Sequence, residues 1–119
     1  MYDVIIIGSG PAGLTASIYA VRASLKTLVV AGYNQGGQLM LTMLVENYPG
    51  FPNGIEGPVL MQNMRKQAEN LGVEFVDKDA VEIDVSKRPF LVKTDKVFES
   101  KSLIIATGAD TKWLEVAGE

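Results

Sequence analysis

Short apolar runs recur along this chain of 119 residues, and they predict a mixed α/β fold. Residues at about 3–7, 27–31 and 102–106 are almost continuously apolar, which is typical of strands buried on both faces of a parallel sheet. Residues 74–76 predict a further short strand. Because a helical pattern separates the first two runs, we expect a β-α-β unit with a right-handed crossover.

Two segments carry apolar residues at helical spacing. The first extends from Pro11 to about Ala23, and its apolar positions are Leu14, Ile18 and Val21. Pro11 suits the first helical position, because the N–H group of any residue there has no partner within the helix and proline lacks this group. The second segment is Pro58–Leu71, with an apolar face formed by Leu60, Met64, Ala68 and Leu71. Its charged residues predict a solvated face: Arg65, Lys66 and Glu69.

The last third of the chain predicts a β-meander over residues 80–101. Its three extended runs are 80–85, 90–94 and 97–101, and polar turn residues separate them. A doubly wound fold would ordinarily place a helix in this connection. The end of the chain, residues 113–119, predicts no element of its own.

Residues 32–57 predict a long loop, because glycine and proline punctuate the whole stretch. Such a long loop in a compact domain is usually functional or disordered, and Tyr48 and Phe51 favour an ordered loop that wraps a ligand. The apolar residues within 39–45 are compatible with a flat aromatic ligand, or with a core or a buried interface.

Composition narrows the possible functions. The hydrophobic content of 47% and the charged content of 21% are those of one globular domain. The net charge of −3 provides no basic surface for nucleic acid or an anionic membrane. The longest strongly apolar stretch, residues 39–45, is far shorter than the roughly 18 residues of a membrane span. Since Met1 leads directly into a strand, we expect no signal peptide and a cytoplasmic protein.

The chain contains no Cys and no His. The absence of Cys excludes disulfides, thiolate metal sites, dithiol redox chemistry and Cys nucleophiles. The absence of His removes the commonest general base and metal ligand. We therefore assign no catalytic residue and no metal ligand, and any redox chemistry would belong to a bound cofactor.

The strongest chemical signal is a G-x-G-x-x-G pattern formed by Gly8, Gly10 and Gly13 between the first strand and the first helix. In a dinucleotide fold these glycines permit the tight turn, the approach of a pyrophosphate and close helix–strand packing, respectively. The amides at the helix N-terminus attract an anion without any Lys or Arg. The alternative is a tight strand–helix turn that binds nothing.

The second strand departs from this dinucleotide pattern. An Asp or Glu near its end ordinarily binds the ribose hydroxyls. Here Ala31 and Gly32 hold that place. The contact must therefore be replaced by backbone or abandoned, which argues against a simple NAD site.

Several motifs together identify a resemblance. The segments 2–13 (YDVIIIGSGPAG), 36–39 (GGQL), 45–52 (VENYPGFP) and 104–109 (IIATGA) resemble low-molecular-weight thioredoxin reductases of the pyridine nucleotide-disulfide oxidoreductase family. The resemblance covers essentially the whole chain. It implies an α/β, Rossmann-like FAD-binding domain with a parallel sheet and a β-meander crossover, incomplete relative to the family.

The residues that this resemblance implies for FAD lie in separate segments: Gly8 to Gly13, with Ser9, Gly10, Pro11 and Ala12 at the pyrophosphate; Gly36, Gly37 and Gln38 at the ribityl chain and flavin; Ala80, by its backbone, at the adenine; and Thr107 and Gly108 beneath the cofactor. Asn47 would hydrogen-bond near the isoalloxazine, or else form an Asx-turn that starts the following bend. Gln38 is alternatively a solvated loop amide.

The sequence departs from the resembled family in two ways. Residues 39–46 are mostly apolar where the family commonly has a threonine-rich run with an acid. The family also inserts an NADPH domain with a Cys-x-x-Cys into its FAD domain, and residues 116–119 resemble the linker before that insertion. We therefore expect residues 1–119 to be the N-terminal portion of an FAD domain, without the NADPH domain and the dithiol.

In a full-length parent, electrons would pass from NADPH through FAD to the disulfide of thioredoxin, whereas this chain alone is expected to be inactive. Two alternatives are the FAD part of a thioredoxin reductase-like ferredoxin–NADP reductase and a stand-alone flavin-binding module. A missing cover over residues 39–45 and Phe51 would expose apolar surface. We therefore expect weak FAD binding, or pairing with a second copy or a complementary fragment.

Overall fold

The computed structural model describes residues 1–41 and 43–108, and these residues form two sheets and two α-helices. The larger sheet is parallel and has the strand order β3-β2-β1-β7. Its strands are β1 (Val4–Ile7), β2 (Thr27–Val30), β3 (Glu74–Val76) and β7 (Leu103–Ile105). The smaller sheet is antiparallel and consists of β4 (Glu82–Asp84), β5 (Phe90–Lys93) and β6 (Val97–Ser100).

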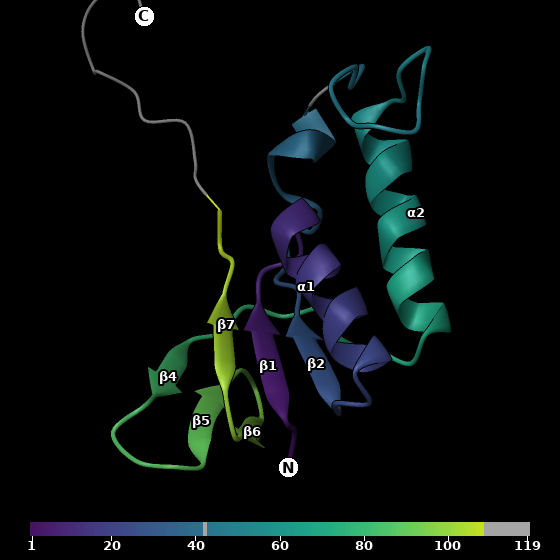
Figure 1. Ribbon diagram of the computed structural model, residues 1–119. Coiled ribbons are helices and arrows are strands. Elements are labelled where there is room, and N and C mark those ends of the chain that lie inside the picture. The colour runs from purple at the N-terminus through teal and green to yellow at the C-terminus, as the bar shows by residue number, and fades with distance from the viewer. Residues whose placement is uncertain (42, 109–119) are drawn as a thin grey trace, which may run out of the picture.

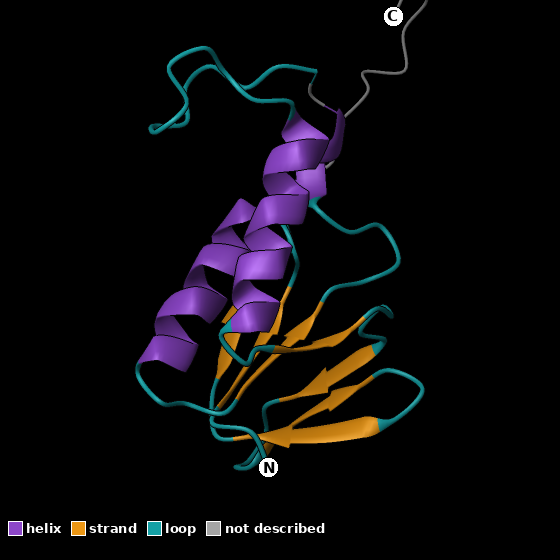
Figure 2. Cartoon of the chain, turned by 90° about the vertical axis from the view of Figure 1, so that its right-hand side faces the viewer, coloured by secondary structure: helices purple, strands orange, loops and turns teal. Residues whose placement is uncertain are grey.

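The molecule has three layers. Helices α1 (Pro11–Arg22) and α2 (Gly57–Asn70) cover one face of the parallel sheet, and the β4–β6 sheet lies against the other face (Figures 1 and 2). Alternate residues of β1 serve the two layers: Val4 and Ile6 pack toward the helices, while Ile5 and Ile7 pack toward the β4–β6 sheet. This two-sided burial explains why β1 is a continuous apolar run.

The predicted parallel sheet, first helix and β-meander are therefore confirmed, with strands slightly shorter than predicted. Pro11 stands in the first turn of α1, and the helix ends one residue before Ala23. The second helix spans Gly57–Asn70, but its face differs from the prediction. Leu71 is 40% exposed beyond the end of the helix, and Met61 takes a buried place instead.

Three further predictions need correction. The strand at 102–106 is not buried: β7 lies at the edge of the sheet, and Ile105 is 61% exposed. The loop at 32–57 contains a 3-10 helix, η1 (Gly37–Leu41), and Val45 is buried rather than exposed. The prediction for residues 113–119 lies outside the described residues, as does Ala109 of the last motif.

Arg65 is also not simply solvated. Its guanidinium donates to Asp77 at 2.7 Å and lies over the ring of Phe75. It thereby fastens α2 to the end of β3. None of the helices in the described part of the chain combines the length and the apolar character that a membrane-spanning helix requires.

Candidate functional site

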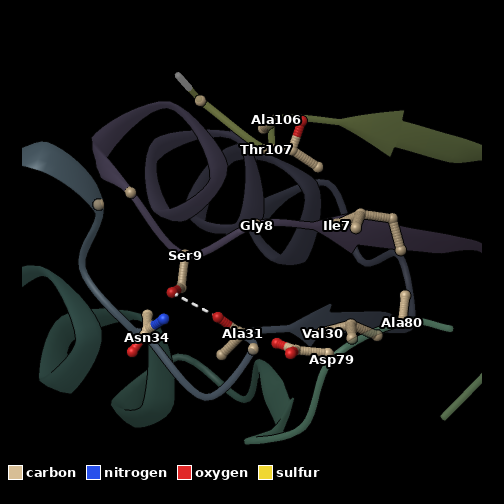
Figure 3. Close-up of a pocket in the computed structure, with 14 residues that line it drawn as sticks. Ile7, Gly8, Ser9, Val30, Ala31, Asn34, Asp79, Ala80, Ala106 and Thr107 are labelled. Carbon is tan, nitrogen blue, oxygen red and sulfur yellow. Dashed lines mark hydrogen bonds between the residues drawn. The ribbon is translucent and has the colours of Figure 1, made fainter. Parts of the chain in front are cut away.

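A cavity of about 390 Å³ lies at the carboxyl ends of β1, β2 and β7 (Figure 3). Its walls come from segments that are far apart in the chain, including residues 7–10, 30–32, 79–80 and 106–108. Because the strands are parallel, the backbone turns away from the sheet at this edge and leaves a crevice, which is where open α/β sheets bind ligands.

A second hollow of about 980 Å³ adjoins the first, and both are lined by Gly10, Gly37 and Thr107. The sequence-predicted residues divide between the two. The cavity at the sheet edge is lined by Gly8, Ser9, Gly10, Gly37, Ala80, Thr107 and Gly108. The adjoining hollow adds Pro11, Ala12 and Gln38.

Three predicted residues line neither hollow. Gly13 is buried where α1 crosses the end of β1. Gly36 lines a separate small pocket beside Met61. Asn47 lies in a shallow hollow with Tyr48 and Phe51, on the loop beyond η1. The structure therefore does not bring Asn47 together with the residues at the sheet edge.

Two of the three motif glycines are required by the protein's own backbone. Gly8 has a φ of +118°, and a Cβ atom there would lie 2.0 Å from the carbonyl oxygen of Ala106. A Cβ atom on Gly13 would lie 2.2 Å from the carbonyl oxygen of Gly8. These glycines let β7 and α1 approach the end of β1, whether or not a ligand binds.

Gly10 is different. It has a φ of −73°, which any residue adopts, and a Cβ atom there would meet only the Cα of Gly37, at 3.8 Å. That is an ordinary van der Waals distance. Neither the conformation nor the packing of the described chain therefore requires glycine at this position. What a side chain on Gly10 would fill is the two hollows themselves.

The electrostatics of the site favour an anion. Gly10 is the N-cap of α1, no side chain caps the helix, and its first turn contains no acidic residue. The first N–H groups of a helix have no intrahelical partner, and the helix dipole places positive charge there. Gly10 thus stands where a phosphate group could approach the free amides closely.

The Ser9 hydroxyl has a structural partner on each side. It donates to the carbonyl oxygen of Ala31 at 2.9 Å (Figure 3), and it accepts from the N–H of Gly36 at 3.2 Å. Ser9 is 6% exposed. The side chain therefore fastens the end of β1 to the end of β2 and to the loop before η1.

Sequence reasoning missed two polar residues of the cavity wall, Asn34 and Asp79. Asn34 stands in the predicted loop at 32–57, directly after β2, but no motif assigned it a particular role. Asp79 reaches the site because β2 and β3 pair side by side, and no signal in the sequence identified it.

Comparison with known proteins identifies the family. Residues 2–119 match the pyridine nucleotide-disulphide oxidoreductase family. The chain belongs to this family. It is 51% identical over 118 residues to the thioredoxin reductase of Rickettsia felis, an alignment that covers 98% of this chain and 38% of that protein.

The solved structures agree. The thioredoxin reductase of Lactococcus lactis superposes with a TM-score of 0.92 at 44% identity, over 100% of this chain and 39% of that one. That of Giardia duodenalis gives a TM-score of 0.90 at 45% identity, over 99% and 39%. The resemblance to thioredoxin reductases and the FAD-domain-like fold are thereby confirmed. The chain spans about two fifths of the length of these relatives.

Proposed function

We propose that this chain is the FAD-binding part of a thioredoxin reductase-like flavoprotein, and that residues 1–119 form the N-terminal portion of its FAD domain. The observation that carries the proposal is Gly10. Neither the backbone conformation nor the packing of the described residues requires glycine at this position. A side chain there would, however, fill the hollow in front of the free amides of α1. A dinucleotide pyrophosphate needs that space and that positive helix end.

The predicted residues that line the two hollows keep their proposed roles in this assignment. The backbone from Ser9 to Ala12 would hold the pyrophosphate, and Ala80 would meet the adenine. Gly37 and Gln38 would face the ribityl chain, with Thr107 and Gly108 beneath the cofactor. FAD supplies the redox chemistry when it is bound, and the protein contributes orientation and electrostatics.

The full-length protein would take electrons from NADPH and pass them to thioredoxin, in the cytoplasm. These roles need an NADPH domain and a dithiol, and this chain contains no Cys. The 119-residue chain alone should therefore reduce no thioredoxin disulfide with NADPH. A downstream Cys-x-x-Cys in the gene would separate a thioredoxin reductase from a ferredoxin–NADP reductase.

We also propose that these 119 residues alone leave part of the flavin site and its apolar surroundings open to solvent. Leu41 lines the second hollow and is 76% exposed. Met43, in the loop that follows η1, is 82% exposed. We propose that the chain binds FAD weakly, or pairs with a second copy or a complementary fragment. Light scattering and visible absorbance after gel filtration test this, and a compact monomer with stoichiometric FAD would contradict it.

The experiment that tests the site compares Gly10→Ala and Gly10→Val with Gly13→Ala. FAD binding is measured by flavin fluorescence, and the free energy of unfolding by urea denaturation. Both Gly10 variants should stay folded and lose FAD affinity, the valine variant more. Gly13→Ala should instead lose stability, because its Cβ would meet backbone. Unchanged FAD affinity in Gly10→Val would overturn the assignment.

A further inference from the structure

The end of β2 lacks the carboxylate that dinucleotide folds place there, but the structure supplies one from elsewhere. A Cβ atom built on Gly32 would lie 3.0 Å from Oδ1 of Asp79. Asp79 therefore occupies the space that a side chain at Gly32 would take. Gly32 also has a φ of +79°, a conformation that L side chains rarely adopt. The absence of a side chain at Gly32 thus leaves the room that the Asp79 carboxylate takes.

Backbone pairing brings Asp79 to this place. Ladder hydrogen bonds continue beyond β2 and β3: the N–H of Ala31 donates to Val76 at 2.8 Å, and the N–H of Gly32 donates to Lys78 at 3.1 Å. The residue after Lys78 thus arrives beside Gly32. The N–H of Tyr33 then donates to Oδ1 of Asp79 at 3.0 Å and fixes the side chain through one oxygen.

The second oxygen is available to a ligand. Within residues 1–41 and 43–108, no hydrogen bond or ion pair reaches Oδ2 of Asp79. The neighbouring cations are committed elsewhere: Lys78 pairs with Asp95, and Arg65 pairs with Asp77. The hydrogen bond from Lys78 also lowers the pKa of Asp95. Asp79 lines both hollows, and Figure 3 shows its carboxylate beside Ala31.

We propose that Asp79 accepts hydrogen bonds from the adenosine ribose hydroxyls of the bound dinucleotide, and that its charge makes this site reject a ribose that carries a 2′-phosphate. This inference rests on the proposed function, since it presumes that a dinucleotide lies at this edge of the sheet. The position fits: Asp79 adjoins Ala80, the residue proposed to meet the adenine. A carboxylate that accepts a hydrogen bond from a hydroxyl group binds that group strongly, whereas it repels a phosphate dianion at the same place.

The test uses the 119-residue chain and four small probes: ADP, 2′-deoxy-ADP, 3′-deoxy-ADP and ADP with a 2′-phosphate. Affinities are measured by calorimetry for the wild type, for Asp79→Asn and for Asp79→Ala. The matched control is Asp77→Asn, which removes the same charge two residues away and outside both hollows. FAD affinity is measured in parallel by fluorescence.

In the wild type, loss of the bonded hydroxyl should weaken binding roughly tenfold to a hundredfold, the range of a hydrogen bond to a charged group. In Asp79→Ala this difference between ADP and its deoxy analogues should vanish, and the 2′-phosphate should be tolerated better. In Asp77→Asn the difference should persist. Equal weakening of all four probes in the Asp79 variants would mean that Asp79 only orders the Tyr33 loop, and it would overturn the inference. A wild type that binds neither ADP nor FAD would overturn the proposed function, and this inference with it.

Discussion

Strands β1 and β7 have nearly the same composition and lie side by side, yet their environments are opposite. Val4, Ile5, Ile6 and Ile7 are between 0% and 7% exposed, whereas Ile104 is 38% and Ile105 is 61% exposed. The register pairs Ile6 with Ile104, so the two side chains point to the same face of the sheet. Composition alone therefore does not decide burial.

Position in the sheet explains the difference. β1 has β2 on one side and β7 on the other, and α1 covers it. β7 is an edge strand, and Figure 1 shows it on the side of β1 away from both helices. An apolar edge strand invites further pairing or cover.

The strongest test of this comparison replaces each residue of the pair Ile6 and Ile104 by alanine. Ile6→Ala removes a side chain that is fully buried between β1 and the helices, and it should cost about 2–5 kcal/mol in the free energy of unfolding. Ile104→Ala should cost less than half as much, because that side chain already contacts solvent. Urea denaturation of both variants measures the difference. Equal losses would show that β7 is covered in solution, for example by a second copy.

Gly8 is the point where the ends of β1 and β7 meet. Gly8→Ala would force a Cβ atom against the carbonyl oxygen of Ala106 and strain a φ of +118°, which should cost roughly 1–3 kcal/mol. The strain should be relieved by moving the edge strand rather than the central one. Hydrogen exchange should therefore show lost protection at Ala106, whose N–H donates to Ile7 at 2.8 Å. Retained protection at Ala106, with lost protection at β2, would show that the central strand β1 moves rather than the edge strand β7.

Much of this architecture could be predicted from the sequence, because its causes are local. The run 3–7 and the helical spacing after Pro11 identified β1 and α1, and the polar turns identified the β4–β6 sheet. Edge position is not local. The residues of β7 are as apolar as those of β1, and only the strand order β3-β2-β1-β7 shows which of them is covered.

The candidate site divides in the same way. The motif glycines were found because they stand in one short segment with a known spacing. Asp79 was missed because it replaces a residue expected at the end of β2 with one from beyond β3, which only strand pairing reveals. The η1 helix was missed because Gly36 and Gly37, at its start, predict a turn rather than a helix.

The Ser9 hydroxyl distinguishes the two sides of β1. At the carboxyl end of β1 a side chain fastens the strand to β2 at Ala31, whereas the described contact with β7 at this end is a backbone hydrogen bond from the N–H of Ala106 to Ile7. Ser9→Ala would leave the carbonyl oxygen of Ala31 and the N–H of Gly36 without this partner, at a cost of about 1–3 kcal/mol. Ser9→Thr keeps the hydroxyl and serves as the control. Denaturation should show a clear loss in the alanine variant, and an equal loss in both variants would indicate packing rather than hydrogen bonding.

The smallest effect concerns the opposite ends of these strands, where Asp3 precedes β1. Its carboxylate accepts the N–H of Lys26 at 2.7 Å, before β2, and pairs with Lys101 at 3.3 Å, before β7. The hydrogen bond from Lys26, aided by Lys101, lowers the pKa of Asp3 below its ordinary value. The folded state therefore holds the proton less tightly than the unfolded chain does. This contribution to stability is complete above the unfolded pKa of about 4 and is lost as the pH falls through the folded pKa.

Between about pH 6 and pH 8 the urea midpoint should stay nearly constant, because the chain has no His or Cys side chain to titrate there. Below about pH 4 it should fall, and the fall should be smaller in Asp3→Asn, which keeps an oxygen for the Lys26 N–H but cannot be charged. Asp84 and Asp95, whose pKa values are also lowered, should leave a residual acid dependence in the variant. Because Asp3 contacts solvent, salt should reduce the difference between the two proteins. An identical acid profile for both would mean that Asp3 joins the three strand ends through geometry alone, without an electrostatic contribution.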